Sequence, residues 1–383
     1  MKILLITNIL TPYRIAFYDA LFESFDNSGD EFAIFVMEET EPNRCWNYAD
    51  FSRPYTTLLP GKTLSRGGIF IPINFGVKKA IRSYAPDIII VSGSYLSPAS
   101  WVATNLAKKC GIPVLFWSES HDGEARTYGG LKIKIRERLR SIFYSKLDGF
   151  WYPGKKARQL IEKYANPKAV YINVPNLIDN RRYAELDGNG FSKFHDSSKA
   201  TSPENPRVFL CPARLEPAKG ILEFLELLNE CQNKNFMRLL IAGEGDLREK
   251  IELFIKEKRL NVELLGQQAE NQMLELYSSA DALVLPSKSD PNPLSCIEAC
   301  WSGLPLLVSN HVGNAPEVVM PGKNGFVFSF QEREEAIDKI ETLIMAGEDW
   351  YKNAGTISKE IARKDFDLAT AAKRISIELK SIA

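Results

Sequence analysis

The chain has 383 residues, more than one hydrophobic core ordinarily organises, and this length predicts two domains. Hydrophobic residues make up 45% and charged residues 25% of it, which is typical of a globular protein and excludes a fibrous or disordered one. Lys and Arg balance Asp and Glu at 48 each. The balance is uneven, because residues 1–175 hold 23 basic against 16 acidic side chains. Either an acidic partner (phosphates or a lipid surface) or chance surface variation explains this excess, and nucleic acid is not an expected partner.

The compartment is predicted from cysteines and apolar runs. The six cysteines show no pairing or metal-ligand spacing, which favours free thiols in a reducing compartment. The opening MKILLITNILTPYR is broken by Asn8 and Pro12, so it is a poor signal peptide and a better buried strand. No stretch approaches the ~18 apolar residues of a membrane span. We therefore expect a cytoplasmic protein.

Short apolar runs alternate with helical patterns along the chain. Strands are predicted at 2–7, 31–36, 87–92, 113–117, 149–153 and 169–173, and the pattern restarts at 207–212, 237–243, 261–266, 281–286 and 304–309. Continuous apolar strands separated by helices indicate parallel sheets covered on both faces. Two doubly wound α/β domains follow, with a crevice at the carboxyl ends of the strands. The crossover is predicted near Pro175–Asp179, with 187–206 as a surface loop.

The first candidate site is DPNPLSCIEACWSGLPLLVS, residues 290–309. Asp290 follows a predicted strand, and Glu298 lies eight positions later in a helix beginning near Pro293 or Leu294. The amides and positive dipole of a helix N-terminus suit a phosphate or a sugar hydroxyl. The two carboxylates can accept hydrogen bonds from the vicinal diols of a sugar and a ribose. A helix cap and a solvated Glu explain the same residues equally well.

A second candidate is CPARLEPAKG, residues 211–220, where Arg214 and Lys219 share one strand-to-helix loop. Two cations at the mouth of a sheet can hold a pyrophosphate and stabilise it as a leaving group. Two ordinary surface cations are the alternative.

A third is AGEGDLREKIE, residues 242–252, in which a strand runs into Gly243 and Gly245. A nucleotide-contacting turn and an ordinary turn both fit a single GxG.

In this order the motifs resemble the family-four retaining glycosyltransferases of GT-B type (glycosyl transferases group 1). That family's pattern runs G-R-L-x-x-x-K-G, G-x-G-x-L, a strand ending in P-S, two Glu separated by seven residues, and A-x-x-x-G-x-P-V. The matching stretches are ARLEPAKG, GEGDL, LVLPS, Asp290 to Glu298, EACWSGLPLL and GNAPEVVMPGKNGFVF. The resemblance covers nearly all of 207–330 and is weaker in the N-terminal half.

The resemblance implies a GT-B fold, with two Rossmann-like domains facing an interdomain cleft. Residues 1–175 would bind the acceptor, residues 176–363 would bind a nucleotide sugar, and a helix at about 364–383 would return to the first domain. The reaction would be transfer, with retained configuration, from a nucleotide diphosphate sugar to a saccharide or lipid-linked hydroxyl. Bacterial polysaccharide or glycan assembly is the usual setting.

The resemblance also implies roles for single residues. Arg214 and Lys219 would contact the donor diphosphate, Asp290 the transferred sugar and Glu298 the ribose. Backbone amides around Asn292–Leu294 would line the sugar, and the nucleotide would lie beside Gly243 and Gly245. Two departures bear on the donor sugar: Asp290 stands where the family has Glu, and Pro293, which has no amide to donate, stands where it often has Gly.

The acceptor side offers two candidates in PVLFWSESHDGEA. A His often lines the family's catalytic cleft after the fourth strand; Glu119 has the matching offset here, and His121 follows two residues later. Either could touch the sugar or the acceptor. His195 lies in the polar insert and is expected to be inert, whereas a role for His311 stays open.

No metal or cofactor is expected, because the cationic pair already neutralises a diphosphate. Asp365 and Asp367 form a D-x-D, the metal motif of another glycosyltransferase fold, but they begin the last helical pattern and fit a helix cap.

The segment LKIKIRERLRSIFYSK, residues 131–146, combines an apolar helical stripe with flanking cations. The stripe comprises Leu131, Ile135, Leu139, Ile142 and Phe143, and the cations are Lys132, Lys134, Arg136, Arg138 and Arg140. Contact with an anionic membrane at its inner face and core packing with snorkelling cations both fit this pattern.

Two other functions remain compatible with the motifs. A nucleotide-sugar epimerase of the same fold would convert the donor without an acceptor. A non-catalytic sugar-nucleotide-binding partner of a synthase complex would bind the donor without turnover.

Overall fold

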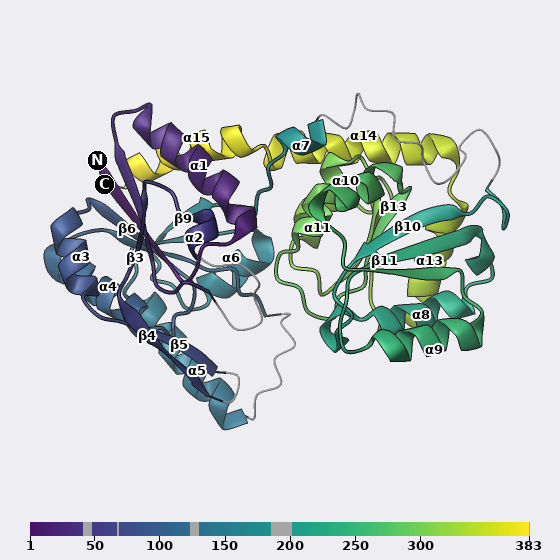
Figure 1. Ribbon diagram of the computed structural model, residues 1–383, viewed down its shortest axis with the longest axis horizontal. Helices are drawn as coiled ribbons and strands as arrows, with labels where there is room; N and C mark the ends of the chain where they lie inside the picture. The colour runs from purple at the N-terminus through teal and green to yellow at the C-terminus, as the bar shows by residue number, and fades with distance from the viewer. Residues whose placement is uncertain (41–47, 67–68, 123–129, 185–200, 383) are drawn as a thin grey trace. The chain divides into compact units, whose positions relative to one another are not determined.

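The computed structural model describes residues 1–40, 48–66, 69–122, 130–184 and 201–382. The chain forms two compact units (Figure 1). Of the described residues, the first unit holds 1–121, 130–179 and 368–382 apart from the gaps named above, and the second holds those within 180–367. The predicted surface loop 187–206 and His195 lie largely or wholly outside the described residues.

The sheet of the first unit consists of parallel strands in the order β3-β2-β1-β6-β7-β8-β9. The bounds are β1 Lys2–Thr7, β2 Glu31–Val36, β3 Thr56–Leu58, β6 Ile88–Ser92, β7 Val114–Trp117, β8 Gly149–Tyr152 and β9 Val170–Asn173. The central strands β1 and β6 each contain a continuous apolar run, as expected where helices cover both faces of the sheet. Six of the seven strands confirm predictions to within one residue; β3 was not predicted.

Helices pack on both faces of this sheet. On one face, α3 Val77–Tyr84, α4 Pro98–Cys110 and the C-terminal end of α5 Gly130–Tyr144 join the strands in one core. On the other, α1 Pro12–Asp26 lies beside α15 Leu368–Lys380 (Figure 1). The remaining helices are α2 Tyr48–Phe51 and α6 Lys155–Glu162.

The C-terminal helix is fixed to the N-terminus of the chain by charge. The Asp30 carboxylate lies 2.6 Å from the Lys380 ammonium and 2.9 Å from the terminal ammonium of Met1. Burial on its own raises the pKa of Asp30, but these two cations outweigh burial and lower that pKa below its usual value. The helix expected to return to the first domain is thereby confirmed, although it begins at Leu368 and not at 364.

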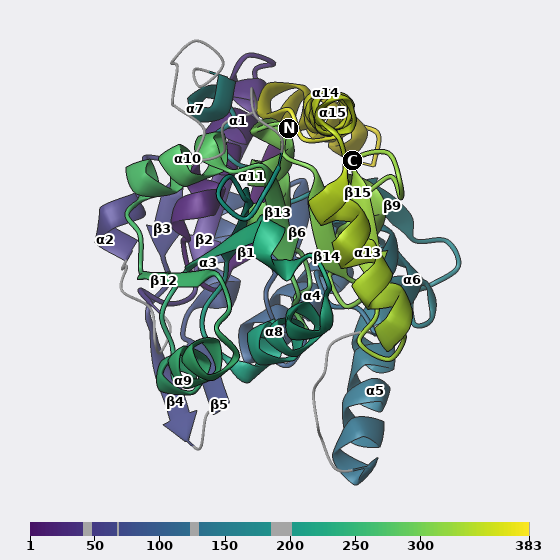
Figure 2. The ribbon, with the colours of Figure 1, turned by 90° about the vertical axis from the view of Figure 1, so that its right-hand side faces the viewer.

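An antiparallel hairpin of β4 Gly61–Arg66 and β5 Ile69–Asn74 was not predicted from the sequence. Its polar residues and Pro72 argue against a buried strand, and a two-stranded hairpin outside the main sheet tolerates both. Together with α5, this hairpin projects from the body of the first unit (Figure 2).

The second unit repeats the same design with strand order β12-β11-β10-β13-β14-β15, all parallel. The strands are β10 Arg207–Pro212, β11 Met237–Ala242, β12 Val262–Gly266, β13 Ala282–Leu285, β14 Leu306–Ser309 and β15 Gly325–Phe328. The helices are α7 Arg181–Ala184, α8 Ile221–Glu230, α9 Arg248–Lys258, α10 Glu270–Ser279, α11 Leu294–Trp301, α12 Ala315–Val318, α13 Arg333–Met345 and α14 Glu348–Asp365, with 3-10 turns at η2 Pro217–Lys219 and η3 Lys234–Phe236. Strand β15 was not predicted; the other five confirm predictions to within two residues.

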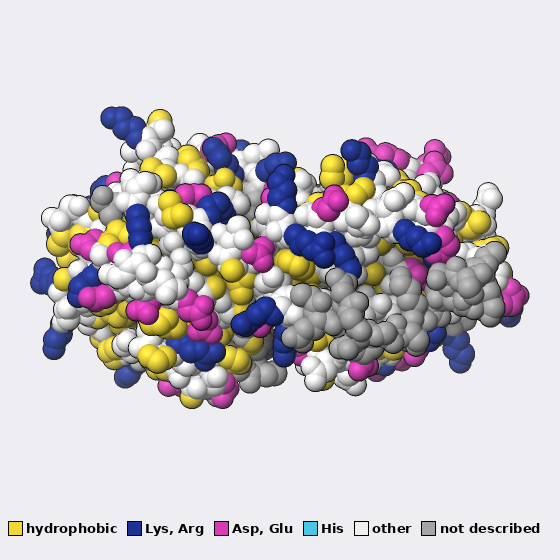
Figure 3. Space-filling model, turned by 90° about the horizontal axis from the view of Figure 1, so that it is seen from above, with side chains coloured by type: hydrophobic (Ala, Val, Ile, Leu, Met, Phe, Trp, Pro, Cys, Tyr) yellow, Lys and Arg dark blue, Asp and Glu magenta, His cyan; other side chains and the backbone are white. Residues whose placement is uncertain are grey.

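The charged side chains on the surface are mixed in sign. Seen from above, Lys and Arg side chains alternate with Asp and Glu side chains (Figure 3). The basic excess of residues 1–175 therefore does not form a single patch on this face. None of the described helices is both long and apolar enough to cross a bilayer.

The packing of α15 leads to a stability prediction. Ile375 is fully buried and Ile377, on the same helix, is 59% exposed. Ile375→Ala should lower the free energy of unfolding by about 2–5 kcal/mol, because it leaves a cavity. Ile377→Ala is the matched control and should change it by less than about 0.5 kcal/mol. Urea denaturation measures both, and equal effects would mean that α15 is not packed as described.

Candidate functional site

The predicted donor residues collect at the carboxyl edge of the second sheet. In a parallel sheet, the loops that leave the carboxyl ends of neighbouring strands meet at one edge. Arg214 and Lys219 follow β10, Gly243 and Gly245 follow β11, and Asp290 follows β13. Strands β11, β10 and β13 are neighbours, so these three loops are adjacent.

The two glycines hold the loop that carries Arg214. A Cβ on Gly243 would come within 2.1 Å of the Ala213 carbonyl oxygen, and one on Gly245 within 2.5 Å of the Leu215 carbonyl oxygen. The amide of Leu215 also donates to the Glu244 carbonyl oxygen at 2.9 Å. Close backbone packing thus requires glycine at both positions. Their predicted contact with a nucleotide remains a prediction.

Lys219 and Asp290 form an ion pair. The Lys219 ammonium lies 2.5 Å from the Asp290 carboxylate, and the two side chains are only 17% and 13% exposed. The sequence predicted separate roles for them, on a diphosphate and on a sugar. The pair joins the β10 and β13 loops and holds the carboxylate that was predicted to face the transferred sugar.

Arg214 forms a separate ion pair with a different carboxylate, that of Glu216. Its guanidinium lies 2.5 Å from the Glu216 carboxylate, and its side chain is 65% exposed. An exposed pair of this kind contributes little to stability, so Arg214 is free to exchange Glu216 for another anion.

The loop before α11 is braced by the segment after β14. Asn314 donates to the Pro293 carbonyl oxygen at 2.9 Å, and the Gly313 amide donates to the Asp290 carbonyl oxygen at 2.8 Å. Gly313 must be glycine, because a Cβ there would lie 1.5 Å from the Pro291 carbonyl oxygen. The helix begins at Leu294, so Pro293 precedes it without an amide to donate.

Glu298, predicted to hold a ribose, lies beside two tyrosines. The Tyr277 hydroxyl donates to its Oε2 at 2.6 Å, and the Tyr183 side chain lies near enough to the carboxylate to affect its pKa. Burial raises the pKa of Glu298, and the two tyrosine hydroxyls only partly counter this. Sequence reasoning missed both tyrosines, because Tyr183 lies on α7 and Tyr277 on α10, and no spacing along the chain relates them to α11.

At the carboxyl edge of the first sheet, Glu119 pairs with a residue that the sequence did not single out. The Arg14 guanidinium lies 2.6 Å from Glu119 Oε1. Burial alone lowers the pKa of Arg14, but the Glu119 carboxylate and Tyr18 raise it above its ordinary value. His121 is buried, at 4% exposure. The only sequence signal for Arg14 was its place in the TPYR loop after the first strand.

The remaining candidates from the sequence are the D-x-D motif and His311. Asp365 ends α14, and Asp367 accepts a hydrogen bond from Asn180 at 3.0 Å between α14 and α15. Within the described ranges, no three His, Cys, Asp or Glu side chains come together as a metal site. The His311 amide donates to Ser309 Oγ at 3.2 Å, and a role for its imidazole stays open.

Comparisons with known proteins identify the type of domain. Residues 192–358 match the family model described as glycosyl transferases group 1. A relative from Campylobacter jejuni, "GalNAc-alpha-(1->4)-GalNAc-alpha-(1->3)-diNAcBac-PP-undecaprenol alpha-1,4-N-acetyl-D-galactosaminyltransferase", is 24% identical over 298 residues, which are 77% of this chain and 75% of the relative.

Solved structures share the fold over the whole chain. The lipopolysaccharide outer core galactosyltransferase WaaB superposes with a TM-score of 0.74 at 15% identity, over 100% of both chains. The Anabaena protein HepE in complex with UDP and glucose superposes with a TM-score of 0.70 at 16% identity, again over 100% of both chains. These likenesses confirm the GT-B fold.

The partly buried Glu298 leads to a pH prediction. Its pKa is higher in the folded than in the unfolded chain, so the folded protein binds the proton more tightly. This contribution to stability is complete below the unfolded pKa of about 4.3 and is lost as pH rises through the folded pKa. Glu298→Gln does not titrate, so the stability of the variant relative to wild type should increase from pH 4 to pH 8. Urea denaturation at both pH values tests this, and a difference that stays constant or falls would contradict it.

Proposed function

We propose that this chain, which belongs to the glycosyl transferases group 1 family, transfers a sugar with retained anomeric configuration from a nucleotide diphosphate sugar to a saccharide or lipid-linked hydroxyl. The observation that carries the proposal is the convergence of the Lys219–Asp290 pair, the Arg214 loop and the Glu298 helix at one edge of the second sheet. Cations for a diphosphate and carboxylates for hydroxyls are thereby adjacent.

The residues act mainly by positioning and by stabilising charge. The bond between the anomeric carbon and the diphosphate oxygen breaks, and the acceptor oxygen bonds to that carbon on the same face. The acceptor proton passes to the departing diphosphate. Lys219 and Arg214 stabilise the negative charge that develops there, while Asp290 and Glu298 accept hydrogen bonds from the sugar and the ribose.

UDP is the first nucleotide to test, because HepE, which has the same fold, was crystallised with UDP and glucose. The acceptor class follows the Campylobacter jejuni relative, whose name includes a diphosphate-linked undecaprenol. We propose that no divalent metal takes part, because the two cations are available to the diphosphate.

A donor and acceptor screen tests the function. UDP-, GDP- and TDP-sugars are incubated in excess EDTA with methyl α-D-N-acetylgalactosaminide or undecaprenyl-diphosphate-linked N-acetylgalactosamine, and the products are analysed by mass spectrometry and NMR. Metal-independent transfer with retained configuration is expected. An epimer formed without acceptor would indicate an epimerase, and donor binding without turnover a non-catalytic subunit.

The cationic pair supplies the sharpest site prediction. Lys219→Met and Arg214→Met should each reduce kcat/KM at least tenfold, because a charge-assisted hydrogen bond contributes about 1.5–3 kcal/mol. The double variant should be nearly inactive. Arg238→Met is the matched control, since Arg238 forms an exposed ion pair with Glu263 at the amino end of β11. Retained activity in the double variant would place the diphosphate elsewhere.

We further propose that α5 contacts an anionic membrane surface, which would bring a lipid-linked acceptor to the enzyme. Its apolar stripe is divided: Phe143 is buried against Phe116, whereas Ile135, Leu139 and Ile142 are 52%, 37% and 43% exposed. Core packing therefore does not account for the exposed part. Arg140 is left out of the basic residues that we expect to contact the membrane. Its guanidinium lies 5.1 Å from the centre of the Tyr95 ring and so packs against the first unit itself.

The membrane contact is tested with vesicles. The wild type should bind vesicles of phosphatidylglycerol at low salt and release them as salt rises, since each basic side chain contributes about 1 kcal/mol and is screened within a Debye length. Replacing Lys134, Arg136 and Arg138 with Gln should weaken binding at least tenfold and slow transfer to the lipid-linked acceptor only. Replacing Lys250, Lys256 and Lys258 of α9 is the control with equal charge loss. No binding by the wild type would end this idea.

A further inference from the structure

Arg14 occupies a position that helix stability does not explain. Strand β1 ends at Thr7 and α1 begins at Pro12, which places Arg14 in the first turn of the helix. That turn contains no acidic residue. A cation near a helix N-terminus is disfavoured by the helix dipole, which attracts negative charge there. Some other interaction must therefore account for the cation.

The ion pair with Glu119 is largely removed from water. The Arg14 side chain is 13% exposed, and its guanidinium stacks 4.2 Å from the centre of the Trp117 ring. The cost of removing two charges from water offsets most of their attraction, and apolar residues of similar shape are often no less stable. Stability alone therefore does not explain why charged residues occupy these two positions. What it does is fix where the Glu119 carboxylate lies.

One carboxylate oxygen of this pair remains accessible at the carboxyl edge of the sheet. Arg14 binds Glu119 through Oε1, and the Glu119 side chain is a third exposed, which leaves Oε2 available. The Thr11 hydroxyl is buried and has no hydrogen-bond partner within the described part of the chain. Glu119 Oε2 is therefore the atom of this cluster that a ligand hydroxyl can reach.

We propose that Arg14 is a positioning residue for the acceptor. It holds the Glu119 carboxylate at the carboxyl edge of the first sheet, with Oε2 directed to accept a hydrogen bond from the attacking acceptor hydroxyl. The proton itself still passes to the departing diphosphate, so Glu119 orients the hydroxyl without being consumed. This inference rests on the proposed glycosyl transfer and adds the residues that recognise the acceptor.

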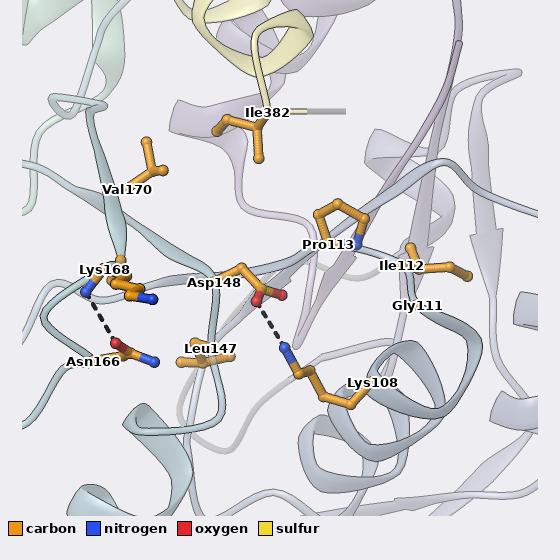
Figure 4. A pocket seen from close by; sticks show the side chains of 11 residues that line it. Lys108, Gly111, Ile112, Pro113, Leu147, Asp148, Asn166, Lys168, Val170 and Ile382 are labelled. Atoms are coloured by element: carbon orange, nitrogen blue, oxygen red, sulfur yellow. Dashed lines mark hydrogen bonds and ion pairs between the residues drawn. The ribbon is translucent and has the colours of Figure 1, made fainter.

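The test separates acceptor recognition from donor binding. Arg14→Met, Arg14→Lys, Glu119→Gln and the double variant Arg14→Met/Glu119→Gln are compared with wild type, using the donor and the N-acetylgalactosamine acceptor that the wild type accepts. The matched control is Lys108→Met. Lys108 pairs with Asp148 at 2.7 Å in a pocket at the opposite, amino edge of the same sheet (Figure 4). Kinetics give acceptor KM and kcat, and calorimetry gives the donor Kd.

Arg14→Met and Glu119→Gln should each lower kcat/KM for the acceptor at least tenfold, with donor Kd within twofold of wild type. The double variant should be no worse than the worse single variant, because both act through one carboxylate. Arg14→Lys should recover part of the loss, and Lys108→Met should match wild type.

Wild-type acceptor kinetics in Arg14→Met, or additive losses in the double variant, would overturn the proposal. A loss of donor affinity equal to the loss in kcat/KM would also overturn it. If Arg14→Met does not fold, the comparison of Arg14→Lys with Glu119→Gln decides by the same criteria. An inactive wild type that binds no donor would instead refute the proposed function, and this inference with it.

Discussion

The ion pair between the Lys219 ammonium and the Asp290 carboxylate joins two loops that are 71 residues apart in the chain. Its formation requires that β10 and β13 be neighbours and parallel, so that both loops leave the sheet at the same edge. The apolar strands and covering helices of the second unit secure that arrangement. Chemistry at this edge therefore depends on a sheet topology that distant parts of the sequence establish together.

The charges at this edge are balanced, and that balance bears on how a donor could bind. Lys219 and Arg214 are neutralised by Asp290 and Glu216. A diphosphate that binds here must break at least one of these two ion pairs and take the place of its carboxylate. The exposed Arg214–Glu216 pair gives way at low cost, whereas the partly buried Lys219–Asp290 pair does so only if another group replaces each partner. A donor that offers phosphate oxygens to Lys219 and sugar hydroxyls to Asp290 supplies both replacements.

Much of this arrangement could be predicted from the sequence, for identifiable reasons. Strands buried on both faces are continuous apolar runs, so eleven were found close to their observed bounds. The hairpin of β4 and β5 carries polar residues and a proline because it lies outside the main sheet, and β15 is a short strand that starts on Gly325. The polar hairpin does not show the apolar pattern on which the prediction relied, and β15 offers only three apolar residues after its glycine.

Some site residues could be predicted from the sequence and others could not. Lys219, Asp290 and Glu298 lie in motifs of fixed spacing, so local sequence sufficed to propose them. Contacts made only by folding escaped prediction: Tyr183 and Tyr277 reach Glu298 from two other helices, and Arg14 reaches Glu119 across the strand β6 that separates β1 from β7.

Hydrogen exchange on the full-length protein, with and without saturating UDP-glucose, tests most directly whether the carboxyl edge of the second sheet binds the donor. Amides in 213–220, 243–247 and 290–298 should exchange more slowly with the ligand, because the diphosphate, the ribose and the sugar contact those loops. Amides at the amino edge of the same sheet, around 234–238, should be unaffected. Protection confined to other segments, or a bound donor that leaves these three loops unchanged, would contradict the account.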